Sequence, residues 1–211
     1  MEALEVWENK GERLKIYHDD DPQDMRDFDN LGIMLCAHGR YTLGDEQFES
    51  REAIDNRLVE LNPVIKIPLW LLDHSGLAMQ TGSFISDAQQ WDSGQVGWIV
   101  ATKKDILDCF TGYDKDGKRE PMRQLLSPRM IKDAERILRN EVADYDNYLQ
   151  GNVYGYELSE VTKCTTAGFE DEEHEKEVES CWGFYPMKGE DASDVIKGAI
   201  GIPTKGWVQM K

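Results

Sequence analysis

The sequence predicts an α+β fold, in which one domain over residues 1–211 contains a mixed or mainly antiparallel sheet and one long helix at about 128–150. The 211 residues, 40% of them hydrophobic, are enough for one domain with a sizeable core. Helical and strand-like patterns are interspersed without the regular alternation of a parallel β-α-β sheet. The segment 128–150 repeats apolar residues at helical spacing throughout, which makes it the longest predicted helix.

The N-terminal part alternates between apolar and polar residues on both sides of Asn9-Lys10-Gly11. This pattern predicts a β-hairpin, because glycine permits the positive φ of a tight turn. The acidic stretch 19–29 contains a proline and no periodicity, which indicates a loop. A short apolar strand follows at 32–37, and Ser50 is the predicted N-cap of a helix that ends at Leu61.

Two more strands are predicted at 64–73 and 96–101. Pro68 removes a hydrogen-bond donor from the first, which favours an edge position or a bulge. The second is almost continuously apolar, which is typical of a central strand covered on both faces. The residues between them are rich in Gly, Ser, Thr and Gln, and we interpret them as a long loop of the kind that often carries function.

The long helix is predicted to begin at Ser127-Pro128, an N-cap followed by a proline at the first helical position, and to end before Gly151. Strands are predicted at 153–161 and 178–185, with a long acidic loop between them. Two short elements complete the chain: a helix at 192–197 and an extended segment at 206–210.

The composition excludes several classes of protein. There are 41 acidic against 24 basic residues, a net charge of −17, so binding to bulk DNA or to an anionic membrane is not expected. No apolar window approaches the roughly 18 residues of a membrane span and no basic leader precedes an apolar run, so we expect a cytoplasmic protein. The four cysteines are widely spaced and form no CxxC pair, so we expect reduced thiols.

The acidic excess is unevenly distributed. Residues 103–139 hold ten basic and seven acidic side chains, a net of +3, so the rest of the chain carries −20. Two acidic runs, 19–29 and 170–179, carry net charges of −5 and −6. The long helix is basic in its first half and acidic in its second, against the macrodipole preference of about 0.3–1 kcal/mol per charge.

Helix stability therefore does not account for this arrangement, which fits either a solvated face or a surface that meets a basic partner. The predicted partner-binding carboxylates come from both acidic runs and from the end of the helix: Asp19, Asp20, Asp21, Asp27, Asp29, Glu141, Asp144, Asp146, Glu170, Asp171, Glu172 and Glu173.

Histidines and carboxylates recur at the ends of three predicted strands. His18 ends the hairpin, His38 follows the strand at 32–37, and Asp73 and His74 end the strand at 64–73. If these strands are neighbours with aligned ends, the four residues form a catalytic acid–base site or a site for a divalent metal. No HExxH, HxH or paired-Cys motif accompanies them, so hydrogen-bonded strand ends are the alternative.

Several established motifs are absent. The sequence has no P-loop, no GxGxxG after a strand and no GxSxG, which argues against P-loop, Rossmann and nucleophile-elbow chemistry. The segment 114–120 fails the spacing of a calcium loop, because Arg123 stands where a glutamate is needed. Trp91 lies in the long glycine-rich loop and is the candidate for stacking on a ligand.

The segments IPLWLLDHSGLAMQTGSF, WDSGQVGWIVATKKDI and SCWGFYP, with the stretch GRYTLGD, resemble an uncharacterised family of proteins encoded on phages, plasmids and other mobile elements of bacteria. The resemblance covers most of the chain up to Tyr185, and WDSGQVGW is its most specific piece. It carries no catalytic residues. It implies a setting, since small acidic proteins of mobile genomes often inhibit host defence as anti-CRISPR or anti-restriction proteins.

The leading hypothesis is therefore an anti-defence protein that binds the basic surface of a nucleic-acid-processing protein in the cytoplasm of the host cell. Carboxylates at helical spacing lie about 5–6 Å apart and duplex DNA presents one charge per about 1.7 Å, so the acidic segments would imitate part of a phosphate track. This function needs no cofactor and no membrane, and it is compatible with a homodimer.

Two alternatives from other classes stay open. One is a metal-assisted or acid–base nuclease or nucleotide hydrolase that uses His18, His38, Asp73 and His74, with a divalent metal in the metal-assisted case. The other is a sponge that sequesters a nucleotide signal in a pocket built from residues 73–97, with Trp91 against the ligand.

Overall fold

The computed structural model describes residues 2–112, 115–118, 125–164, 173–186, 190–200 and 206–210. Helices occur together with antiparallel and mixed sheets, which confirms the α+β class. The sequence analysis expects one domain over 1–211, whereas the contacts within the chain form two compact units. The first unit consists of residues 1–23 and 151–211, and the second of residues 24–150.

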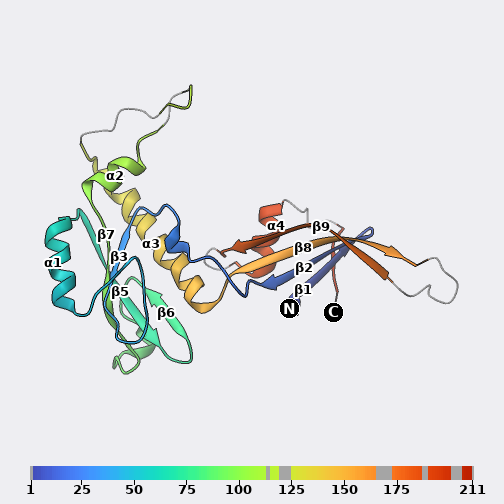
Figure 1. Ribbon diagram of the computed structural model, residues 1–211, viewed down its shortest axis with the longest axis horizontal. Helices are drawn as coiled ribbons and strands as arrows, with labels where there is room; N and C mark the ends of the chain where they lie inside the picture. Colours follow the sequence, from blue (N-terminus) through green and yellow to red (C-terminus); the bar gives the residue numbers. More distant parts are fainter. Residues whose placement is uncertain are drawn as a thin grey trace. The chain divides into compact units, whose positions relative to one another are not determined.

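The first unit is built on a five-stranded antiparallel sheet with the order β10-β1-β2-β8-β9 (Figure 1). The β1–β2 hairpin is confirmed, and its two turn residues, Lys10 and Gly11, have positive φ of 47° and 89°. The strands are β1 (Glu5–Asn9), β2 (Glu12–His18), β8 (Tyr154–Lys163), β9 (Glu173–Phe184) and β10 (Val208–Gln209).

Helix α4 (Ala192–Ile200) covers one face of this sheet. Its buried Ala192 and Ile196 pack with Leu14, Ile16 and Tyr156 of β2 and β8. The predicted helix at 192–197 is therefore confirmed and extends three residues further.

Charged side chains link β2 to β9 across the intervening strand β8. The guanidinium of Arg13 lies 2.7 Å from Glu173 and 2.5 Å from Glu175, and Lys15 Nζ lies 2.6 Å from Glu175. These ion pairs explain why residues 173–177 belong to a strand, where the sequence analysis expects an acidic loop. Glutamates at alternate positions lie on one face of a strand, where Arg13 and Lys15 neutralise them.

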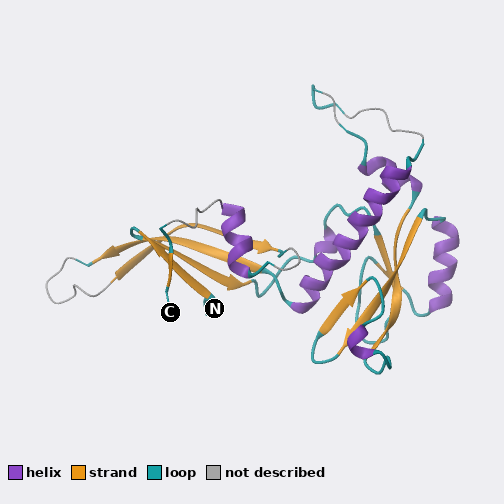
Figure 2. Ribbon diagram, turned by 180° about the vertical axis from the view of Figure 1, so that it is seen from behind, coloured by secondary structure: helices purple, strands orange, loops and turns teal. Residues whose placement is uncertain are grey.

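The second unit has a mixed five-stranded sheet with the order β4-β3-β7-β5-β6, in which β3 and β4 are parallel. Helices α1 and α3 lie on opposite faces of this sheet (Figure 1, Figure 2). The strands are β3 (Ile33–Cys36), β4 (Glu46–Gln47), β5 (Ile65–Asp73), β6 (Leu77–Gln80) and β7 (Ser93–Ala101). The helical elements are η1 (Met25–Asp27), α1 (Arg51–Leu61), η2 (Ile85–Asp87), α2 (Lys103–Cys109) and α3 (Pro128–Gln150).

Both long helices have the predicted caps. Ser50 Oγ accepts from the backbone N–H of Ala53 at 3.2 Å, and Ser127 Oγ accepts from Met130 at the same distance. On one face of the sheet, Ile54 and Leu58 of α1 pack with Leu35 and Val100. These contacts fix α1 beside β3 and β7.

The predictions for the two central strands are confirmed. Strand β7 lies between β3 and β5, and its Ile99, Val100 and Ala101 are fully buried. Pro68 lies where β5 pairs with β7 alone, beside a bulge between Leu69 and Trp70. At that position a proline breaks no hydrogen bond toward β6.

The long loop predicted between these strands is shorter than expected. Residues 77–80 form β6, which pairs with β5 as a hairpin, and 85–87 form the short helix η2. Leu77-Ala78-Met79 is too short an apolar run to distinguish from a loop in the sequence. Helix α2 was not predicted, although Thr102 and Asp105 form a complete capping box at its start.

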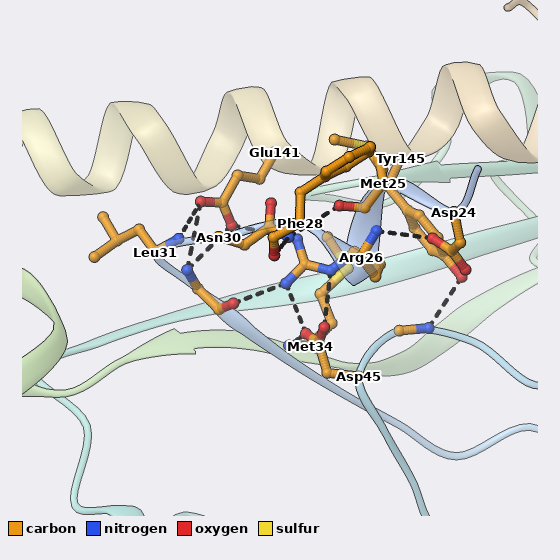
Figure 3. A network of polar contacts seen from close by, with 12 residues as sticks. Asp24, Met25, Arg26, Phe28, Asn30, Leu31, Met34, Asp45, Glu141 and Tyr145 are labelled. Atoms are coloured by element: carbon orange, nitrogen blue, oxygen red, sulfur yellow. Dashed lines mark hydrogen bonds and ion pairs between the residues drawn. The ribbon is translucent and has the colours of Figure 1, made fainter. Parts of the chain in front are cut away.

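The interior of the second unit contains a charged side chain, Arg26 of η1, that the sequence analysis placed in an acidic loop (Figure 3). Only 3% of this side chain is exposed. Its Nη2 donates to Asp45 Oδ2 at 2.6 Å and to the carbonyl of Gly32 at 2.7 Å, and Nη1 lies 3.3 Å from Glu141 Oε2 of α3. The arginine therefore connects the segment before β3, the segment before β4 and the long helix.

The two carboxylates that neutralise Arg26 also hold β3 in place. Glu141 accepts from the backbone N–H of Leu31 at 2.7 Å and of Gly32 at 3.1 Å. Asp45 Oδ2 accepts from the N–H of Met34 at 2.6 Å. Burial raises the pKa of Glu141, although the N–H of Leu31 and the charge of Arg26 act in the opposite direction.

We predict that Glu141→Ala destabilises the second unit by about 3–5 kcal/mol, because it leaves Arg26 buried with half of its neutralising charge removed. The free energy of unfolding is measured by native-state hydrogen exchange at amides in the middle of α3. Glu135→Ala is the matched control, since Glu135 lies on the same helix and pairs with Arg139 at 3.0 Å in an exposed position. The control is expected to cost about 0.5 kcal/mol or less. Equal losses in the two variants would contradict a structural role for Glu141.

Candidate functional site

Two hollows of the second unit meet along a common wall, formed by residues 37–39 and 95–96. The first, here the Trp91 hollow, has a volume of about 430 Å³, and its lining includes Arg40, Asp73 and Trp91. The second, here the Arg51 hollow, has a volume of about 550 Å³, and its lining includes Phe48, Arg51 and Trp98. His38 and Gln95 line both hollows.

The topology of the sheet explains why His38 and Asp73 line the same hollow. Strands β3 and β5 are both antiparallel to β7, so they run parallel to each other and their C-terminal ends lie at the same end of the sheet. His38 follows β3, Asp73 ends β5, and β7 begins at Ser93 between them. The expected alignment of strand ends therefore holds for these two residues.

Gly97 of β7 permits the close approach of strands at the common wall. A Cβ atom at this position would lie 1.9 Å from the carbonyl oxygen of Leu35 on β3. Any other residue would push the strands apart, since atoms do not approach within that distance. The WDSGQVGW run thus places its second glycine where the sheet requires it.

The ring of His38 has a defined hydrogen-bonding pattern. Its Nδ1 accepts from the backbone N–H groups of Arg40 and Tyr41, both at 3.3 Å. The ring stacks on Tyr41 with centroids 5.0 Å apart and an interplanar angle of 12°. Burial lowers the pKa of His38, and the charge of Arg40 lowers it further. Because Nδ1 accepts two N–H groups, the neutral form of the ring carries its proton on Nε2 and is a hydrogen-bond donor at that atom.

Arg40, Asp73 and Tyr41 form a polar group beside His38. The guanidinium of Arg40 pairs with Asp73 Oδ2, and the hydroxyl of Tyr41 donates to Asp73 Oδ1 at 3.3 Å. The side chain of Arg40 is 70% exposed, so it keeps hydrogen-bond donors for another group. None of these contacts was predicted beyond Asp73, although Arg40 and Tyr41 belong to the quoted GRYTLGD stretch.

Asp87 fixes the backbone that carries Trp91. One carboxylate oxygen of Asp87 accepts from the N–H of Trp91 at 3.1 Å, and the other accepts from Asp92 at 2.9 Å and Ser93 at 2.8 Å. Desolvation opposes the ionisation of Asp87, but these bonds outweigh it and lower its pKa. The indole of Trp91 is 81% exposed, so a large aromatic surface on a fixed backbone is free to contact a ligand.

Of the remaining predicted catalytic residues, His74 contacts Asp92 of the Trp91 hollow without lining it, and His18 belongs to the first unit. His74 Nδ1 lies 2.9 Å from Asp92 Oδ2, and its side chain is 69% exposed. His18 belongs to β2 of the first unit, where it pairs in register with Tyr154 and its ring lies 5.1 Å from that tyrosine. Within the described part of the chain, no three His, Cys, Asp or Glu side chains are placed to share a metal ion.

The three predicted partner-binding carboxylates of α3 do not form an acidic surface. Glu141 is only 8% exposed and is bound to Arg26, as described above. Asp146 Oδ1 accepts from the N–H of Met79 on β6 at 2.7 Å. Burial raises the pKa of both Asp144 and Asp146. The acidic end of the helix is explained for Glu141 by Arg26 and the backbone before β3, and for Asp146 by the N–H of Met79, so these two carboxylates are not free for a basic partner.

The other predicted carboxylates are in varied surroundings. Asp19 accepts from the backbone N–H of Asp21 and of Gly183, both in the first unit. Glu173 pairs with Arg13, as described above. Glu170, Asp171 and Glu172 lie outside the described residues. The exposed members of the set among the described residues are Asp20, Asp21, Asp27, Asp29 and Glu173.

Comparisons with models of known protein families, with curated proteins and with solved structures gave no significant match. Among the described residues, no helix is both long and apolar enough to span a bilayer.

We predict that the neutral ring of His38 carries its proton on Nε2, with Nδ1 as an acceptor. Nitrogen-15 NMR of histidine-labelled protein distinguishes the two tautomers, and His38→Asn assigns the signal, because asparagine keeps an acceptor at the δ position. The folded pKa lies below the ordinary 6.5, so the stability that His38 contributes is complete above that pH and is lost as the pH falls through the lowered pKa. An Nδ1–H tautomer, or a midpoint above 6.5, would contradict this assignment.

Proposed function

We propose that this protein acts by binding a small ligand, and that the Trp91 hollow captures a nucleotide-like molecule with a planar ring and an anionic group. One arrangement carries the proposal: a neutral donor, His38, lines the same hollow as an exposed arginine, Arg40, and an exposed indole, Trp91. Aromatic faces stack on nucleobases, and guanidinium groups pair with phosphate. A hollow of this size is in the usual range for ligand sites, about 300–1,000 Å³.

The hydrogen bonding of His38 favours binding over acid–base catalysis. A general base needs a free lone pair, and the lone pair of Nδ1 is already engaged by two backbone N–H groups. Its Nε2 holds a proton, so the ring donates to a ligand and does not accept a proton from it. The nuclease alternative is further weakened because neither His18 nor His74 lines this hollow.

The net charge of −17 does not prevent the binding of a small anion. The Debye length at physiological ionic strength is about 8 Å, so distant carboxylates are screened. Two carboxylates line the hollow itself, Asp73, which pairs with Arg40, and Asp92, which contacts His74, so the anion competes with Asp73 for the guanidinium. A long nucleic acid extends beyond this range and meets more of the acidic surface. The charge therefore favours a short ligand over a polymer.

The sequence resemblance implies an anti-defence protein, and ligand binding is compatible with that role. Sequestering a nucleotide signal would block a defence response without contact between the protein and its effector. Charge mimicry is the second candidate, favoured by the exposure of Asp20, Asp21, Asp27 and Asp29. The carboxylates of α3 do not favour charge mimicry, because Glu141 and Asp146 bind groups of their own unit.

We predict that the protein binds adenosine or guanosine mononucleotides in the Trp91 hollow, with quenching of Trp91 fluorescence. Arg40→Ala is expected to weaken this binding about ten-fold, since a charge-assisted hydrogen bond contributes roughly 1.5–3 kcal/mol. His38→Asn removes the Nε2 donor while it keeps the acceptor of the turn, and it is expected to weaken binding several-fold. Isothermal titration calorimetry measures both affinities.

Arg129→Ala is the matched control, because Arg129 is an exposed arginine of α3 that lies 3.7 Å from Asp133. It is expected to bind like the original protein. Absence of binding across the mononucleotides, or equal losses in the Arg40 and Arg129 variants, would contradict the proposed site. Conversion of the nucleotide, detected by chromatography, would favour the enzyme alternative.

A further inference from the structure

We infer that the ligand is a dinucleotide, two nucleosides joined by a phosphodiester, and that it fills the Trp91 hollow and the Arg51 hollow together. The inference rests on the proposed function and specifies its ligand. It starts from the wall that the two hollows share, formed by residues 37–39 and 95–96.

The two hollows repeat one set of chemical groups. The Trp91 hollow has an aromatic side chain, Trp91, and an arginine, Arg40. The Arg51 hollow also has a tryptophan, Trp98, and an arginine, Arg51, although Trp98 is half-buried and Lys66 Nζ lies 4.2 Å from the centre of its ring. An aromatic face with a guanidinium beside it suits one nucleotide, because the face stacks on the base and the guanidinium pairs with phosphate. Two such sets side by side suit two nucleotides.

The shared wall offers donors for a group that joins the two halves. His38 lines both hollows and carries a proton on Nε2. Arg51 Nη2 donates to Gln95 Oε1 at 3.4 Å, and Gln95 also lines both hollows, so the guanidinium of Arg51 lies at this wall. A phosphodiester has one negative charge and accepts several hydrogen bonds, which matches a neutral donor beside a cation.

Size and charge limit the ligand to a free dinucleotide. Each hollow alone, at about 430 and 550 Å³, has the volume of a ligand site, so the pair exceeds what one nucleotide fills. A longer strand would extend past the wall over a protein with a net charge of −17. Each added phosphate then meets repulsion that the two arginines do not offset.

The test compares five probes by calorimetry: adenosine monophosphate, the linear dinucleotide of two adenosines, the two guanosine counterparts, and a ten-nucleotide single-stranded DNA. We expect one dinucleotide to bind per chain, about a hundred-fold or more tighter than the mononucleotide. Linking two groups that each bind a site of their own raises the affinity by about 10²–10⁴. Arg51→Ala is expected to weaken dinucleotide binding about ten-fold and to affect mononucleotide binding in the Trp91 hollow less. Arg40→Ala weakens both, and Arg129→Ala changes neither.

The outcomes separate this inference from the proposed function. If the mononucleotide binds, Arg40→Ala weakens it, and the dinucleotide binds no more tightly, the proposed function stands and the inference is wrong. If Arg51→Ala leaves the affinity for the dinucleotide unchanged, the inference is also wrong. If the ten-nucleotide strand binds more tightly than the dinucleotide, the ligand is a strand and not a free dinucleotide, and the inference is wrong. If neither nucleotide binds, both the function and the inference fail.

Discussion

The second unit depends on the neutralisation of one buried charge, the guanidinium of Arg26. An unpaired arginine inside a protein is very costly, so the fold must bring carboxylates to it. Asp45 and Glu141 come from segments that are remote in sequence, and both also accept backbone N–H groups at the start of β3. One interaction therefore sets the position of β3 against the long helix. Because His38 is the second residue after β3, the same interaction positions the common wall of the two hollows.

Local chemistry explains which elements the sequence predicted. The hairpin at Lys10-Gly11 and the helix after Ser50 depend on residues that are adjacent in the chain, and both were predicted with bounds close to those observed. Strand β6 was missed because its apolar run is short and its burial comes from pairing with β5 and contact with α3. The alternating glutamates of β9 were interpreted as a loop because their neutralising partners, Arg13 and Lys15, lie more than 150 residues away in the chain.

The candidate site was also predictable only in part, because contacts between distant segments bring its residues together. His38, Asp73 and Trp91 were identified from the sequence as residues with suitable chemistry at strand ends or in a loop, and all three line one hollow. Their convergence requires β3 and β5 to run in the same direction on either side of β7, a property of topology that no local pattern contains. His18 has the same local context, at a strand end beside aspartates, yet its strand belongs to another sheet. Arg40 and Arg51 carried no signal as single exposed arginines, and only their position at the hollows includes them in the proposed site.

Several acidic side chains of this protein have structural partners, and this limits which of them could bind another protein. Glu141 and Asp146 are buried and bind groups within their own unit, and Glu173 and Glu175 balance Arg13 and Lys15 on a sheet face. Glu141 and Asp146 would have to lose these partners before they could meet a basic protein, and that loss opposes mimicry of a phosphate track by α3. Arg40 differs, because its pair with Asp73 is exposed, and an exposed pair contributes little and exchanges partners at little cost. This difference is why we propose a ligand site in the hollow in preference to an acidic contact surface.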